Sequence, residues 1–142
     1  MKSIISFFCF VAISCTTLLA QNSGTLQLSV TNVKATEGKI MIAVFDKEAN
    51  FLTSNRFKSV AVPADKKGTI EVEIAGLPFG EYGISIFHDE NDNNELDSNF
   101  MGIPKEPYGF SNNASGTFGP PSYKKAAFSF AKDQQTHSIK VN

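Results

Sequence analysis

A short acidic segment near the middle of the chain carries the residue types that bind hard cations. It starts at His88 and reads His-Asp-Glu-Asn-Asp-Asn-Asn-Glu-Leu-Asp. Oxygen ligands at the first, third and fifth positions of a tight turn converge on one ion, together with the backbone carbonyl of the seventh. The predicted ligands are Asp89, Asn91, Asn93, the carbonyl of Glu95, and Asp97. The segment therefore predicts a loop that binds Ca²⁺ as a structural cofactor.

Three details refine this prediction. Asn94 takes the position where a glycine usually makes a left-handed turn, which asparagine tolerates better than most residues, and Leu96 is expected to be an apolar plug. The loop is not an EF-hand, because the twelfth position is Phe100 where an EF-hand has a glutamate. With two carboxylates in register we expect a dissociation constant on the order of 10⁻⁴ to 10⁻³ M. The alternative is a solvated acidic turn that binds no metal.

The residue pattern does not indicate catalysis, and we expect a protein that is not an enzyme. The alternative is a metal-dependent hydrolase that uses His88, Asp89 and Glu90. The only other histidine is His137, and a third soft metal ligand is lacking after the first twenty residues. We therefore interpret His88 as a strand-end histidine satisfied by hydrogen bonds. No serine lies in a Gly-x-Ser-x-Gly nucleophile elbow.

The first twenty residues are typical of a secretory signal peptide. Lys2 precedes an apolar run of about 17 residues that ends at the small residue Ala20, and polar residues follow. We expect residues 1–20 to be the signal peptide, residues 21–142 to form a single domain, and the product to be exported to the periplasm, the outer surface or the medium. A membrane anchor and a lipoprotein acylated at Cys15 are the alternatives. The apolar residues that follow Cys15 argue against the lipoprotein.

The composition of the exported part excludes several functions. Both cysteines, Cys9 and Cys15, lie in the signal, so disulfides cannot make the domain rigid. Loss of Lys2 leaves 12 basic and 14 acidic residues, a net charge of −2. A nucleic-acid partner is therefore not expected, and neither is an integral membrane segment in the mature chain.

Alternation of apolar and polar residues recurs along the mature chain and predicts half-buried strands. The expected fold is all-β: a seven-stranded antiparallel β-sandwich, transthyretin-like or immunoglobulin-like, with one long ordered loop. The strands are predicted near 25–33, 38–46, 57–63, 69–76, 81–88, 123–131 and 134–141. Residues 47–56 are expected to be a loop. Strictly antiparallel strands would place the long loop at the same end as the turns at 36–38 and 65–68, and we predict that this end binds the partner.

Residues 89–121 lack alternation and are rich in glycine, asparagine, serine and proline. A loop this long is either disordered or functional, and its aromatic residues argue for order. We expect it to bind an unidentified protein or glycan, with contacts from Tyr108, Phe110, Asn112, Asn113 and Phe118. Alternatively, its aromatic residues, together with Tyr123, only pack the loop onto the sandwich.

Two stretches of sequence resemble known proteins. Gly-Leu-Pro-Phe-Gly-Glu-Tyr at 76–82 is similar to a hairpin of transthyretin-like and carboxypeptidase-regulatory-like sandwiches. This hairpin, the segment 87–97, the run Gly-Ile-Pro-Lys-Glu-Pro-Tyr-Gly-Phe-Ser-Asn-Asn at 102–113, and Phe-Gly-Pro-Pro at 118–121 together resemble a family of secreted bacterial proteins, domain of unknown function 2141. The resemblance implies export and a β-rich fold. It implies no activity, because none is assigned to that family.

Overall fold

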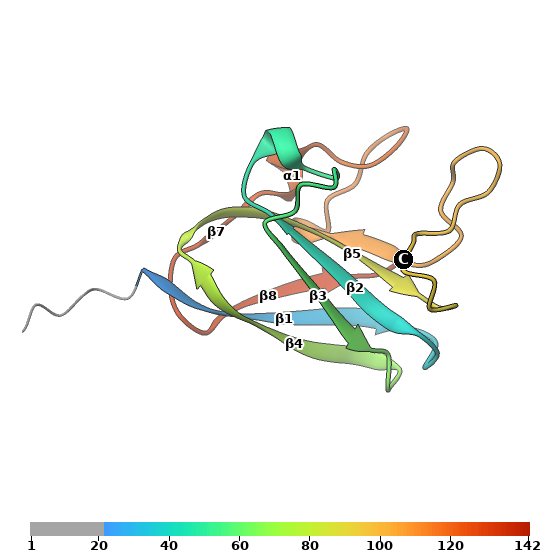
Figure 1. Ribbon diagram of the computed structural model, residues 1–142, viewed down its shortest axis with the longest axis horizontal. Coiled ribbons are helices and arrows are strands. Elements are labelled where there is room, and N and C mark those ends of the chain that lie inside the picture. The colour runs from blue at the N-terminus through green and yellow to red at the C-terminus, as the bar shows by residue number, and fades with distance from the viewer. Residues whose placement is uncertain (1–21) are drawn as a thin grey trace, which may run out of the picture.

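A computed structural model describes residues 22–142, so the predicted signal peptide lies outside the described residues. Two β-sheets pack face to face (Figure 1). The smaller sheet has the order β4-β1-β8, and the larger has the order β3-β2-β5-β6, with β7 also paired to β5. The strands are β1 (Ser23–Val33), β2 (Lys39–Phe45), β3 (Lys58–Pro63), β4 (Gly68–Pro78), β5 (Gly80–Asp89), β6 (Tyr108–Phe110), β7 (Phe128–Phe130) and β8 (Gln135–Lys140). The predicted all-β sandwich is confirmed at this level.

The core lies between the sheets and follows the predicted alternation. In β1 every second residue from Leu26 to Val30 is fully buried, and in β2 the same holds from Ile40 to Val44. Because successive side chains of a strand point to opposite faces, one register fills the core with branched apolar residues. In the other register of β2, Met41 and Ala43 are only partly buried, while Phe45 at the end of the strand is buried. The outer face of the larger sheet is therefore left accessible.

The strand count and pairing differ from the prediction. The described residues contain eight strands, since β6 lies inside the segment predicted to be one long loop. The predicted strand 123–131 divides into a helical turn, α1 (Tyr123–Ala126), and the short β7. Tyr123 and Ala126 are both buried, and a spacing of three residues places both on one face only in a helical turn.

The sandwich is not wholly antiparallel, because β1 and β8 run parallel. β7 pairs with the start of β5, where Gly80 lies opposite Phe130. The start of β5 directly follows the end of β4, and the end of β4 pairs with the start of β1. The chain therefore enters β8 from the end at which β1 begins. A connection of this kind between two sheets has no local sequence signal, so strict alternation of direction was the wrong assumption for this pair.

The turns lie where the sequence predicts them relative to the long loop. Lys39 at the start of β2 pairs with both Pro63 and Asp89, and Val33 pairs with Gly68. The turns at 36–38 and 65–68 and the start of the long loop are therefore at one end of the sandwich, as predicted. The loop 46–57 also follows the prediction, apart from one 3₁₀ turn, η1 (Glu48–Asn50).

The hairpin between β4 and β5 contains a left-handed glycine and a buried tyrosine. Gly76 has φ +66°, which explains the glycine at that position. The side chain of Tyr82 is buried, and its hydroxyl donates a hydrogen bond to the carbonyl of Pro78 at 2.8 Å.

Candidate functional site

The acidic loop begins at a buried carboxylate. Asp89 is fully buried at the end of β5. Its Oδ1 accepts the backbone N–H of Asn93 at 3.0 Å, and its Oδ2 accepts that of Asn94 at 2.8 Å. Asn94 has φ +67°, the left-handed conformation predicted from the sequence. The carboxylate thus fixes the tight turn that the predicted ligand spacing requires.

The other predicted ligands converge on Asp97. Asn91 and Asn93 donate their side-chain amides to the two oxygens of the Asp97 carboxylate at 2.6 and 3.2 Å. Their own amide oxygens accept the backbone N–H groups of Asn93 and Glu95, at 3.2 and 2.8 Å. Four of the five predicted ligand residues therefore interact through their side chains, and Glu95 joins them through its backbone. Their polar groups satisfy one another inside the loop.

A lysine from β2 supplies positive charge to the loop. Lys39 Nζ lies 3.5 Å from Asp89 Oδ2 and donates a hydrogen bond to Asp92. The hydrogen bond to Asp92, together with the negative charge of both aspartates, raises the pKa of Lys39 above its ordinary value even though burial opposes the shift. Burial favours a higher pKa for Asp89, yet the two backbone hydrogen bonds and the charge of Lys39 outweigh it and hold that pKa below its ordinary value.

Glu106 closes the base of the loop and was not predicted from the sequence. It is 6% exposed, and its two carboxylate oxygens accept the backbone N–H groups of Glu90 at 2.9 Å and Asp97 at 3.0 Å. The backbone N–H of Lys105 donates to the carbonyl of Asp97 at 2.8 Å. A single glutamate therefore holds both ends of the loop together. The sequence offered no signal for this contact, because the glutamate lies in an aperiodic stretch.

The donor set for a metal ion is dominated by neutral oxygens. Within residues 22–142, no three side chains of His, Cys, Asp or Glu are grouped so that they could hold a metal ion. A hard cation would therefore need asparagine and backbone oxygens, which is chemistry that Ca²⁺ accepts. Leu96 is 38% exposed, so it does not form the apolar plug predicted from the sequence.

His88 points into the protein interior and is fully buried. Its Nε2 lies 2.7 Å from the carbonyl of Glu37, so Nε2 carries the hydrogen and donates. Its Nδ1 has no hydrogen-bond partner in the part of the chain that the structure describes, and Glu90 Oε1 lies 3.9 Å away. The predicted strand-end histidine is thus satisfied at one of its two ring nitrogens.

A groove of about 850 Å³ crosses the outer face of the larger sheet. The floor of the groove consists of two rows of side chains, each formed by residues that pair across neighbouring strands. One row has large residues, with Phe87 of β5 between Met41 of β2 and Tyr108 of β6. The next row is small, because Ala43 pairs with a serine on each side, Ser59 and Ser85. The floor is therefore hollow along the small row.

Two arms of the long segment wall the groove, the first at 94–104 and the second at 116–120. In Figure 1 they are the golden and the orange-red loops that extend from the sandwich. Their tips carry apolar side chains in water, with Phe100 98% and Phe118 102% exposed. Met101 and Ile103 of the first arm are also exposed. Large apolar side chains at a groove mark a surface that binds something.

Hydrogen bonds hold the first arm and the segment between the two arms. Asn99 Oδ1 accepts the backbone N–H groups of Met101 and Ile103 at 2.9 and 3.1 Å, which fixes the tip of the first arm. The segment between the arms is tied down by Ser111, which is fully buried: its Oγ accepts the N–H of Ile84 at 2.8 Å and donates to the carbonyl of Ala126 at 2.5 Å. The apolar tip of the first arm is therefore carried by a hydrogen-bonded turn.

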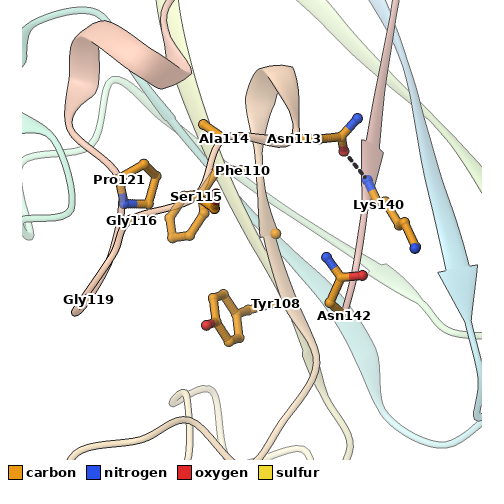
Figure 2. Close-up of a pocket in the computed structure, with 11 residues that line it drawn as sticks. Tyr108, Phe110, Asn113, Ala114, Ser115, Gly116, Gly119, Pro121, Lys140 and Asn142 are labelled. Atoms are coloured by element: carbon orange, nitrogen blue, oxygen red, sulfur yellow. Dashed lines mark hydrogen bonds between the residues drawn. The ribbon is translucent and has the colours of Figure 1, made fainter.

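The predicted ligand-binding residues divide into two groups. Tyr108, Phe110 and Phe118 line the groove. Asn113 lines a second cavity of about 310 Å³ behind the second arm, together with Tyr108 and Phe110. Figure 2 shows both rings projecting from β6 toward this arm, while Asn113 accepts the Lys140 N–H at 2.8 Å on the other side. The Asn112 side chain instead donates to the carbonyls of Lys125 and Ala127.

The long segment leaves the sandwich at the end that the sequence predicts to bind the partner, and its arms line the groove together with residues of β2 and β5. Phe110 and Tyr123 are buried, as the packing alternative predicts, whereas Phe118 is exposed. The sequence did not identify four supporting residues, namely Lys39, Asn99, Glu106 and Ser111.

The fold and the groove define a small all-β module without a membrane-spanning helix in the described residues. The profile of the family described as "Uncharacterized protein conserved in bacteria", domain of unknown function 2141, matches residues 28–138. The chain belongs to that family, as its sequence motifs predict. No curated protein and no solved structure matches it.

Proposed function

We propose that this chain is an exported, non-catalytic binding module that holds its ligand in the groove over β2 and β5. The groove itself carries the proposal: its volume of about 850 Å³ falls within the range of roughly 300–1,000 Å³ typical of small-molecule sites. Two arms that carry exposed apolar side chains wall it, and burial of those side chains would drive binding. Loops held by a rigid scaffold are the usual place for such a site.

The hydrolase alternative gains no support from the described residues. A catalytic histidine must reach the reacting group, either directly or through one water. His88 is fully buried and donates to a backbone carbonyl, and Asp89 is fully buried beside Lys39. These contacts are those of structural side chains.

Nile red, an uncharged apolar dye, tests the groove directly. We expect its fluorescence to rise on addition of the purified protein and to saturate at one dye per chain. Ala43→Phe should abolish the rise, because phenylalanine fills the small row of the floor. Thr136→Phe is the matched control, since Thr136 is exposed in β8 of the other sheet and pairs with Gln27. Equal binding by wild type and Ala43→Phe would refute the site.

Calcium is proposed as a weak structural cofactor of the acidic loop, held by Asp89, Asn91, Asn93, the Glu95 carbonyl and Asp97. The convergence of these residues around a left-handed turn at Asn94 supports the assignment. Lys39 already places a cation beside Asp89, so calcium must compete with it. This competition agrees with a weak dissociation constant, on the order of 10⁻⁴ to 10⁻³ M.

Thermal melting with and without calcium tests this cofactor. At about ten times the dissociation constant, calcium should stabilise the fold by roughly 1.4 kcal/mol, a rise in melting temperature of about 3–6 °C. Asp89→Asn and Asp97→Asn should blunt the rise, Glu90→Gln should leave most of it, and Lys39→Met should enlarge it. Magnesium should substitute poorly because it needs a tighter octahedral shell. Identical melting curves in calcium and in chelator would refute the assignment.

The finer placement of the fold is also a proposal. The hairpin Gly76–Tyr82, with its left-handed glycine and buried tyrosine corner, supports a transthyretin-like or immunoglobulin-like sandwich. Solution of a crystal structure and comparison of its strand order with those folds would test it. The periplasm, outer surface or medium is proposed as the location, on the basis of residues 1–20, and N-terminal sequencing of the exported protein should give Gln21 as its first residue.

A further inference from the structure

The groove carries one positive charge at a defined place. Arg56 is the only arginine in the chain, lies in the loop before β3, and lines the groove. Among residues 22–142, no carboxylate lies within ion-pair distance of its guanidinium group. The other charged residue in the lining is Glu95. The guanidinium group is a planar fork of N–H donors. Without an ion-pair partner at the end of an apolar groove, it is suited to binding an oxyanion.

The two charges stand at opposite ends of the groove. Arg56 lies two residues before Lys58, which pairs with Val44 near the end of β2. Glu95 belongs to the acidic loop, which starts at Asp89, and Asp89 pairs with Lys39 at the other end of β2. Between them lies the floor of apolar and small residues. A ligand anchored at Arg56 therefore extends along an uncharged path.

The pairing of the floor strands argues against a peptide as the ligand. An extended peptide is usually held by main-chain hydrogen bonds to a free sheet edge. β2 pairs with β3 and β5, and β5 pairs with β2 and β6, so these two central strands of the floor have no free edge at which a peptide over them could pair. A ligand without backbone amides loses no main-chain hydrogen bonds by binding over these strands, since its apolar body needs only contact area.

We infer that the groove binds a free long-chain carboxylate, whose carboxylate pairs with Arg56 and whose chain lies over the small row of the floor between the two apolar arms. This inference rests on the proposed function, because it names the ligand class of the same groove. It also assigns a role to the fully exposed Phe118, which lines the groove and whose apolar surface the bound chain would remove from water.

Binding of dodecanoate, dodecanol and dodecyltrimethylammonium to the purified protein, measured by displacement of Nile red, tests the inference. Wild type should bind dodecanoate most tightly. Arg56→Gln should lower the affinity for dodecanoate about tenfold, because a charge-assisted pair is lost. The same variant should leave the affinity for dodecanol unchanged. Lys67→Gln is the matched control, since Lys67 is exposed in the β3–β4 turn, away from the groove.

The outcomes separate the two proposals. If Nile red and all three chains fail to bind, the groove as a binding site is refuted together with its ligand class. If Nile red binds and Ala43→Phe removes it, but Arg56→Gln affects dodecanoate and dodecanol equally, the groove stands and the carboxylate inference is overturned. Preference for dodecyltrimethylammonium overturns it as well, and would point to Glu95 as the anchor.

Discussion

The acidic loop and the two arms of the groove come from the same aperiodic segment, yet the polar groups of the loop are paired with one another, whereas groups in the groove are left open. In the loop, the carboxylates of Asp89, Asp97 and Glu106 each accept two hydrogen bonds. In the groove, Arg56 lacks an ion-pair partner among the described residues, and Phe118 is fully exposed. Internal satisfaction is typical of a structural element, whereas apolar surface and charge left open to solvent are typical of a binding surface. The loop thus supports the arms, and the arms wall the proposed binding groove.

The largest expected effect comes from removing the brace of the loop. Glu106→Ala should lower the free energy of unfolding by about 3 kcal/mol, because two backbone N–H groups lose an ionised acceptor, and the melting temperature by roughly 10 °C. Urea or thermal unfolding measures this. Glu95→Ala is the control, as Glu95 is exposed, and it should stay within about 0.5 kcal/mol. Equal stability of the two variants would contradict the structural role of the loop.

A smaller effect is expected at the tip of the first arm. Asn99→Ala removes the acceptor of two N–H groups, but these groups can turn to water at an exposed tip, so the cost should be about 1 kcal/mol. Amide exchange of Met101 and Ile103 should quicken, while exchange in β2 and β5 stays unchanged. Asn99→Asp keeps an acceptor and should retain most of the protection. Uniform loss of protection across the sheet would show that the arm is not an independent element.

The third prediction uses pH to probe Asp89. Its pKa is lower in the folded protein than the ordinary value of 3.8, so its ionised form stabilises the fold above that pH. The stabilisation should fade as the pH falls below 3.8 toward the folded pKa. The pKa of Lys39 is raised from 10.5, so its contribution is present below that pH and fades above it. Urea unfolding measured from pH 2 to 7 should show a flatter acid limb for Asp89→Asn than for Asp65→Asn, an exposed control.

The sequence predicted the parts of this molecule that depend on local periodicity. Alternation in β1, β2 and β5 identifies the inner face of each sheet because side-chain direction has a period of two. The spacing from Asp89 to Asp97 identifies a tight turn because asparagine favours the left-handed conformation that Asn94 adopts. In each case the information lies within about ten residues of chain.

Contacts between distant segments were not predictable in this way. Glu106 braces a loop that ends nine residues earlier at Asp97, and Lys39 reaches the same loop from β2. The parallel pairing of β1 with β8 depends on the route of the chain between the sheets. The groove depends on the outer rows of four strands, β2, β3, β5 and β6, and on two arms that wall it. Composition indicated an aromatic segment but gave no sign of which aromatic residues would stay exposed.

The smallest expected change in stability comes from Phe118, whose side chain is fully exposed. Phe118→Ser should alter the free energy of unfolding by less than about 0.5 kcal/mol. It should nevertheless lower the affinity for Nile red about tenfold, because the ring is buried only when the groove is filled. Phe57→Ser is its counterpart, since Phe57 packs 5.6 Å from Tyr82 and does not line the groove. That variant should lower the melting temperature and leave the affinity unchanged. If Phe118→Ser destabilises the fold as much as Phe57→Ser does, the second arm is a packing element, and the division between a satisfied loop and an open groove fails at its most exposed residue.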